Sequence, residues 1–230
     1  MHKALVIAFI FSGFSSSVDA QESVLARRIK ADAPGAAVVW LPDGISSGMF
    51  AWRIAESAHV ALVFEALPVE YRDPAIVLQR FDLDGRTVSE ALDALVAQDP
   101  RYGWAEHDGV IVVRPIAMLA DPGNPLNQRI AGVRADRASL EEVLARASAA
   151  VVGAGTGASQ TLPAPIASHE FPLDAPSGTV LDLLAAAARA HGRVMWSMPG
   201  GVRGPAQSAL SIGFRIFAGS DAAVSVDAPR

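Results

Sequence analysis

One stretch organises the sequence: Leu83-Asp84-Gly85-Arg86-Thr87-Val88-Ser89-Glu90-Ala91-Leu92-Asp93-Ala94-Leu95. Thr87 can cap a helix, because its hydroxyl can accept from the backbone at Glu90 while the Glu90 side chain reaches back. Apolar residues then recur at helical spacing and form one face (Val88, Ala91, Leu92, Leu95 and Val96). The stretch therefore predicts a capped amphipathic helix that Asp99-Pro100 ends.

Strand-like segments flank this helix. Residues 81–84 alternate apolar and acidic side chains before Gly85, which predicts a short strand. After the helix, Asp108-Gly109 separates two strand-like runs, and this dipeptide favours a two-residue hairpin turn. Upstream, apolar runs at 36–41 and 60–64 predict strands on either side of a helix at 49–58.

The same unit recurs in the second half of the chain. Phe171-Pro172-Leu173-Asp174 matches Phe81-Asp82-Leu83-Asp84, and the match continues in the same order (Thr179 with Thr87, Val180 with Val88, Asp182 with Glu90, Leu184 with Leu92, Arg193 with Arg101, Trp196 with Trp104). Such an ordered match indicates an internal duplication. We therefore expect an α+β fold of two small modules, each an antiparallel or mixed sheet with two helices packed on it.

Composition shifts give the expected boundaries. The modules cover residues 36–115 and 127–217, and the Pro- and Gly-containing segment 116–126 is expected to link them. Three further segments are expected to be irregular: a mobile lead-in at 21–35, a flexible insertion at 153–165 and a polar tail at 218–230.

The first twenty residues have the pattern of a secretory signal peptide. A cationic start at Lys3 precedes a mainly apolar run at 4–14, and Val18-Asp19-Ala20 supplies small residues where signal peptidase cleaves. We expect cleavage after Ala20 and a periplasmic mature protein. No other segment approaches the ~20 apolar residues of a membrane-spanning helix.

Composition excludes several classes of function. The chain has 230 residues, 51% of them hydrophobic, and a formal net charge of −5. The acidic balance argues against nucleic-acid binding, which needs a basic surface. The absence of cysteine excludes disulfides, thiolate metal sites and a thiol nucleophile.

One motif offers a catalytic alternative. Residues 44–48 read Gly-Ile-Ser-Ser-Gly and fit the G-x-S-x-G pattern of a nucleophile elbow, so Ser46 is the candidate nucleophile of a small secreted serine hydrolase. Ser46 or Ser47 capping the next helix is the structural alternative, and it is favoured. The histidines lie far apart in the sequence and show no metal-ligand spacing, so we expect neither a metal nor a cofactor. A third alternative is a binding protein that holds a small ligand between the two modules.

The stretch 83–95 and the closing Asp108-Gly109-Val110-Ile111-Val112-Val113 resemble the short N-terminal domain of secretins and TonB-dependent receptors (the STN domain). The resemblance covers residues 38–115 well and 129–217 loosely. It implies a non-catalytic module, not an enzyme, that contacts a periplasmic or outer-membrane protein, in tandem and linked to a TonB or secretin-type envelope system. The hairpin at 102–113 is the expected contact element, with five candidate residues: Tyr102, Trp104, His107, Val110 and Val112. Tyr102 and Trp104 share one strand face, which also fits core packing.

Overall fold

The computed structural model describes residues 23–30, 38–39, 46–67, 81–151, 169–192, 194–198 and 213–216. The expected signal peptide, the insertion at 153–165 and the tail at 218–230 lie outside these residues. The fold is α+β, as the sequence predicted. No helix in the described part of the chain is both long and apolar enough to cross a membrane.

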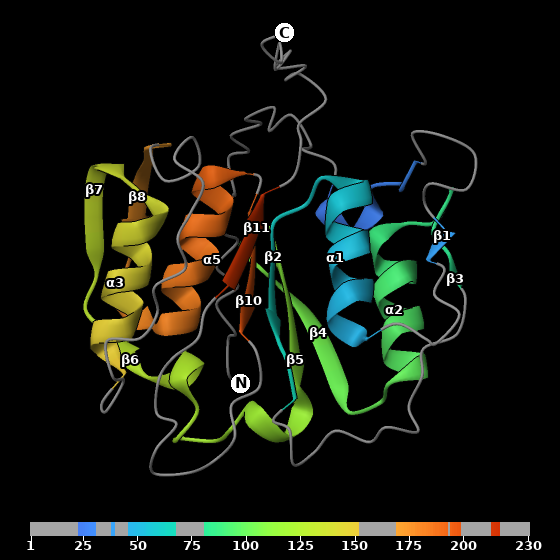
Figure 1. The fold of residues 1–230 in the computed structure, drawn as a ribbon, viewed down its shortest axis with the longest axis horizontal. Coiled ribbons are helices and arrows are strands. Elements are labelled where there is room, and N and C mark those ends of the chain that lie inside the picture. The colour runs from blue at the N-terminus through green and yellow to red at the C-terminus, as the bar shows by residue number, and fades with distance from the viewer. Residues whose placement is uncertain are drawn as a thin grey trace, which may run out of the picture.

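A five-stranded sheet forms the centre of the molecule (Figure 1). Its strands follow the order β11-β10-β2-β5-β4 (β2, Leu62–Glu65; β4, Tyr102–His107; β5, Val110–Pro115; β10, Val194–Met198; β11, Gly213–Ile216). Strand β2 is central and runs parallel to both β5 and β10. Strands β4 and β11 join antiparallel and form the two edges.

Helices lie on both sides of this sheet, in two pairs (Figure 1). Helices α1 (Ser47–Ala58) and α2 (Val88–Gln98) lie on one face, and α3 (Leu140–Ala150) and α5 (Val180–His191) on the other. Short strand pairs lie farther out: β1 (Val38–Val39) with β3 (Phe81–Asp82), and β7 (Val133–Ala138) with β8 (Phe171–Ala175). Strand β6 (Arg129–Ile130) pairs with β9 (Gly178–Thr179).

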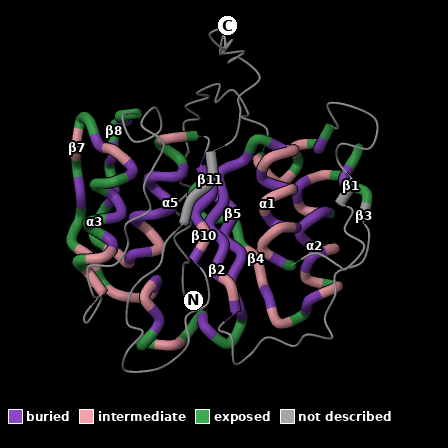
Figure 2. Tube along the Cα trace, in the orientation of Figure 1, coloured by how far each residue is buried: buried purple, intermediate pink, exposed green. Residues whose placement is uncertain are grey.

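Each face of the sheet belongs to a separate apolar core (Figure 2). Side chains alternate along a strand, so Phe64 and Ile111 face α1 and α2, whereas Val63 and Val112 face α3 and α5. Every residue of β2 and β5 is buried, which explains their continuous runs of apolar residues.

Local signals placed the helix starts and the hairpin turn correctly. Thr87, Ser139 and Thr179 each form a complete capping box with the residue three positions on. Asp108 and Gly109 both have positive φ, at 51° and 79°, as a type I′ turn requires.

The structure does not confirm two modules with a sheet each. Strand β10 of the second half pairs with β2 of the first, with Trp196 opposite Val63, so strands from both halves share one sheet. The sequence match between the two halves could not reveal this pairing, because strand pairing between distant segments leaves no local periodicity.

The expected linker and the expected lead-in are described at least in part, and both contact the sheet and the helices. Residues 116–126 include two short 3-10 turns, η3 (Ile116–Met118) and the start of η4 (Pro125–Asn127). Leu126 is fully buried there. In the lead-in, η1 (Val24–Ala26) is followed by Ile29, which is also fully buried and accepts a hydrogen bond from Gly85 N–H at 2.9 Å.

Candidate functional site

The hairpin of β4 and β5 contains the five candidate contact residues, and the structure separates them by exposure. Tyr102, Val110 and Val112 are buried in the cores. Trp104 is half-buried and His107 is exposed. In the hairpin, the end of β4 and Asp108 of the turn are therefore the exposed part, and β4 is the candidate site.

Strand β4 is an edge of the central sheet and, within the described residues, pairs only with β5. His107 and Val110 flank the two-residue turn, so they form a hydrogen-bonded pair, and such pairs recur at every second position. The hydrogen bond from Ile116 N–H to the Arg101 carbonyl, at 2.9 Å, fits this alternation, because Arg101 is separated from His107 by an even number of positions. The backbone groups of Trp104 and Glu106 consequently point away from β5, toward the open edge.

The α1/α2 side of this edge is acidic. The Trp104 indole N–H donates to Asp93 Oδ1 on α2 at 3.1 Å. Glu106 lies two residues along the strand from Trp104 and shares its side of the sheet. Asp93 and Glu106 are exposed, and neither takes part in an ion pair in the part of the chain that the structure describes.

The other side of the edge is lined by small and apolar residues up to Ala105, and by the exposed His107 beside the hairpin turn. Gly103 and Ala105 face this side, and Ala105 is exposed. Ile116 lies beside Gly103, because a Cβ built at Gly103 would be 3.6 Å from Ile116 Cγ1. Ile116 and Leu119 are the large apolar residues that the described part of the chain exposes most, at 54% and 50%. We call Gly103, Ala105, Ile116 and Leu119 the β4 ledge.

The hairpin turn is held by helix α5 of the second half. His107 Nε2 lies 3.1 Å from Asp182 Oδ1. Arg189 Nη1 lies 3.2 Å from Asp108 Oδ2 and also donates to the Asp108 carbonyl. The second half therefore orients the end of β4 through these contacts of α5 with the hairpin turn.

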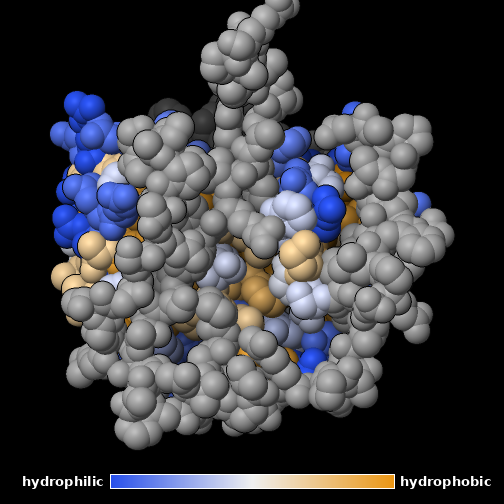
Figure 3. All heavy atoms as spheres, in the orientation of Figure 1, coloured by the Kyte–Doolittle hydropathy of each residue, from blue (hydrophilic) through white to orange (hydrophobic). Residues whose placement is uncertain are grey.

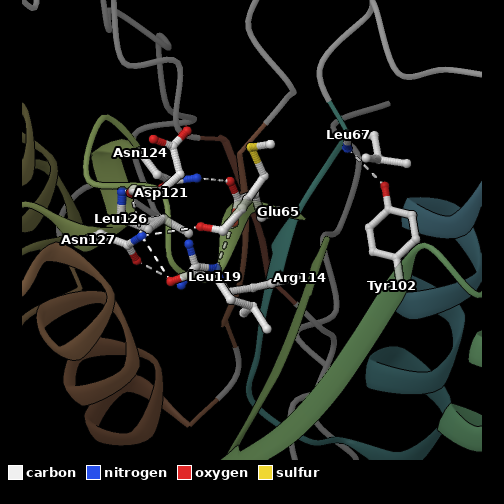
Figure 4. Close-up of polar contacts among 10 residues, drawn as sticks. Glu65, Leu67, Tyr102, Arg114, Leu119, Asp121, Asn124, Leu126 and Asn127 are labelled. Atoms are coloured by element: carbon white, nitrogen blue, oxygen red, sulfur yellow. Dashed lines mark hydrogen bonds and ion pairs between the residues drawn. The ribbon is translucent and has the colours of Figure 1, made fainter. Parts of the chain in front are cut away.

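A buried polar cluster lies at the carboxyl ends of β2 and β5 (Figure 4). Arg114 Nε donates to Glu65 Oε2 at 2.6 Å, Arg114 Nη1 donates to Asn127 Oδ1 at 3.0 Å, and Asn124 donates to the other Glu65 oxygen. Asn127 Nδ2 donates to three backbone carbonyls (Met118, Leu119 and Asp121).

The carboxyl ends of parallel strands are a common place for ligands, but nearly all these polar atoms bond to one another. Arg114 Nη2 is the exception, without a hydrogen-bond partner among the described residues. The cluster therefore ties the 116–128 connection, and Leu119 of the ledge with it, to the sheet. Apart from this cluster, the Tyr102 hydroxyl accepts from Leu67 N–H at 2.9 Å (Figure 4).

Ser46, the alternative nucleophile, is the N-cap of α1, and its Oγ accepts from Met49 N–H at 3.3 Å. The neighbouring Ser47 donates to Asp99 Oδ2 at 2.8 Å, and Arg101 Nε donates to Asp99 Oδ1 at 2.7 Å. Burial would raise the pKa of Asp99, but the hydrogen bonds from Arg101 and Ser47 outweigh it and hold that pKa below its usual range. These contacts fasten the start of α1 to the end of α2.

The second half contains a pair of neighbouring histidines and a surface pocket. The His169 and His191 rings are 4.8 Å apart, centroid to centroid, and pack edge-on beside Phe171. Among the described residues, no group of three or more His, Asp or Glu side chains could hold a metal ion. A surface pocket of about 370 Å³ lies between β7, β8 and α5, within the second half, and is lined in part by Arg134, Asp174 and Arg189.

Comparisons with known protein families, with curated proteins and with solved structures find no match to this chain. The sequence identified the hairpin but missed two features of the edge, the acidic pair and the ledge. Glu106 follows Trp104 at strand spacing, which places both on one side, and this signal was available in the sequence. The exposure of Ile116 and Leu119 was not, because the segment 116–126 had the composition of a linker.

Proposed function

We propose that this chain is an exported, non-catalytic contact module of the bacterial envelope, and that it receives an extended segment of a partner protein at the edge of β4. The outward-pointing backbone of Trp104 and Glu106, which pairs with no strand in the described part of the chain, carries this proposal. An edge strand offers unpaired N–H and C=O groups, and strand addition there is a common mode of recognition. This edge is part of the hairpin that the sequence predicted as the contact element.

The proposed location in the bacterial envelope rests on the sequence. The signal-peptide pattern of residues 1–20 supports export to the periplasm. The resemblance of residues 83–95 to STN domains supports a partner in a TonB-linked or secretin-type system. The local contacts of Ser46 also agree with a non-catalytic role, since its Oγ accepts a hydrogen bond at the start of α1.

Photo-crosslinking in cells tests the proposal. A photoreactive amino acid replaces Glu106 in the full-length chain, and a matched chain carries it at Arg146, an exposed position on α3. Helix α3 and β7 carry a strongly hydrophilic surface (Figure 3), which makes α3 a suitable reference site. We expect a discrete crosslinked envelope protein from position 106 and not from position 146. The same products from both positions, or fractionation of the chain with the cytoplasm, would contradict the proposal.

A further inference from the structure

The two sides of the β4 edge differ in chemistry, and an added strand would meet both. Successive side chains of a strand point to opposite faces of its sheet. Every second residue of a partner strand would therefore lie beside the ledge, and the residues between would lie beside Trp104 and Glu106. The edge thus selects the partner by an alternating pattern.

The ledge side favours large apolar side chains. Gly103 and Ala105 leave space above the strand, and Ile116 and Leu119 expose about half of their surface at one end. Ile116, beside Gly103, therefore offers an exposed apolar surface next to the strand, and the exposed Leu119 follows directly after the same 3-10 turn. Large apolar side chains of the partner would cover this surface and fill the space over Gly103 and Ala105.

The opposite side favours cations. Glu106 and Asp93 are exposed carboxylates without an ion pair among the described residues, and the Trp104 indole N–H donates to Asp93. Opposite charges across neighbouring strands stabilise their pairing, and an indole face also attracts cations. Lysine or arginine is the complement that this side lacks.

We propose that the β4 edge binds an extended segment of its partner in which large apolar residues alternate with lysine or arginine. The inference rests on the proposed function and adds the chemistry of the partner segment. A second copy of this chain fits less well, because antiparallel pairing of two β4 strands would bring the carboxylates of Glu106 and Asp93 in both copies together.

Peptide binding to residues 21–230 tests the inference. Three labelled eight-residue peptides are compared by fluorescence anisotropy: alternating Val and Lys, alternating Val and Glu, and the Val-Lys peptide with a central proline. We expect the Val-Lys peptide to bind at least about tenfold more tightly than either other peptide, a ratio that corresponds to about 1.4 kcal/mol. Equal binding of the Val-Lys and Val-Glu peptides, or no binding of either, would overturn the inference.

Variants locate the binding on β4. Glu106→Lys should weaken the Val-Lys peptide about tenfold, whereas Glu141→Lys, the same charge change on α3, should leave it unchanged. Glu106→Pro removes the outward N–H and should abolish binding, whereas Glu106→Ala removes only the charge and should weaken it. Equal effects of the two lysine variants would overturn the inference, as would a wild-type dimer that Glu106→Pro dissociates.

The outcome also separates the inference from the function on which it rests. If position 106 still crosslinks one envelope protein but no peptide shows the alternating preference, the contact module stands and the partner chemistry is wrong. If crosslinking at position 106 also fails, the proposed function itself is wrong.

Discussion

Glu65 and Arg114 show how one buried pair controls a long connection. Both side chains are almost fully buried, and they hold Asn124 and Asn127 at the carboxyl ends of β2 and β5. A buried ion pair is weak evidence for stability in itself, but the loss of one partner leaves an uncompensated charge in the interior. The pair therefore fixes the path of residues 116–128 more than it adds net stability.

Arg114→Met should lower the free energy of unfolding by about 3–5 kcal/mol, because Glu65 keeps its buried charge and loses its partner. The double variant Glu65→Leu/Arg114→Met should lose less than Arg114→Met alone. Urea denaturation of the wild type, the single variant and the double variant measures these free energies of unfolding. Arg53→Ala, which removes the exposed pair with Glu56, is the control and should cost at most about 1 kcal/mol. A loss of at most about 1 kcal/mol for Arg114→Met as well would contradict the conclusion that Glu65 and Arg114 form a buried ion pair.

Asp99 should make the free energy of unfolding depend on pH in the acidic range. Its folded pKa lies below the ordinary value of 3.8, so the unfolded chain takes up the proton first. The stabilisation from Asp99 is therefore complete above the unfolded pKa and is lost as the pH falls through the folded pKa. Asp99→Asn should be less stable than wild type at pH 7, and the difference should shrink as urea titrations go from pH 5 to below the folded pKa. A constant difference would show that the carboxylate is not held as described.

At the scale of elements, the start of α5 depends on a glycine. Asp182 completes the capping box with Thr179, and a methyl group at Gly178 would overlap the Asp182 carboxylate. The corresponding turn of the first half has Gly85 in open space with φ of +72°. The two turns thus use glycine for different reasons, close packing in one and backbone conformation in the other.

This difference predicts different coupling. Gly178→Ala should cost about 1 kcal/mol through the lost cap, and it should cost little in an Asp182→Ala background, where the methyl group has room. Gly85→Ala should cost about 1 kcal/mol through its positive φ, and this cost should add to that of Glu90→Ala. Urea denaturation of both double-mutant cycles measures the coupling; additive behaviour at 178 and 182 would refute the close-packing explanation.

Helices and turns that depend on neighbouring residues could be predicted from the sequence. The contacts that these elements make with distant segments could not. Thr87 with Glu90, and Asp108 with Gly109, specify a helix start and a turn within four residues, so the helix and the hairpin were correctly predicted. Val110 and Val112 are buried because α3 and α5 of the second half cover that face of the sheet. No local pattern contains that information, and so the sequence located the hairpin without showing which of its residues are exposed.

At the scale of the whole molecule, β2 belongs to both halves. It pairs with β5 on one side and β10 on the other, and its two faces enter the two cores. The hairpin of the first half and the hairpin of the second therefore lie on opposite sides of one strand. This arrangement makes β4 an edge of the sheet, where it pairs with β5 alone among the described strands.

A shared strand should couple the stability of the halves. Val63 lies on β2 but packs in the core of α3 and α5, and Val63→Ala should cost about 2 kcal/mol. Hydrogen exchange should then accelerate to a similar extent in α2 and α5, because both helices depend on the same sheet. Acceleration confined to α5 would indicate that the halves unfold separately.

The pairing of β2 with β10 is the central structural claim, and NMR measures it directly. In the labelled full chain, backbone nuclear Overhauser contacts should connect 62–65 with 195–198 in the parallel register that places Trp196 opposite Val63. Their observation would establish one sheet shared by both halves, with β4 at its edge. Contacts within each half and none between β2 and β10 would contradict it, and would return the chain to two independent modules.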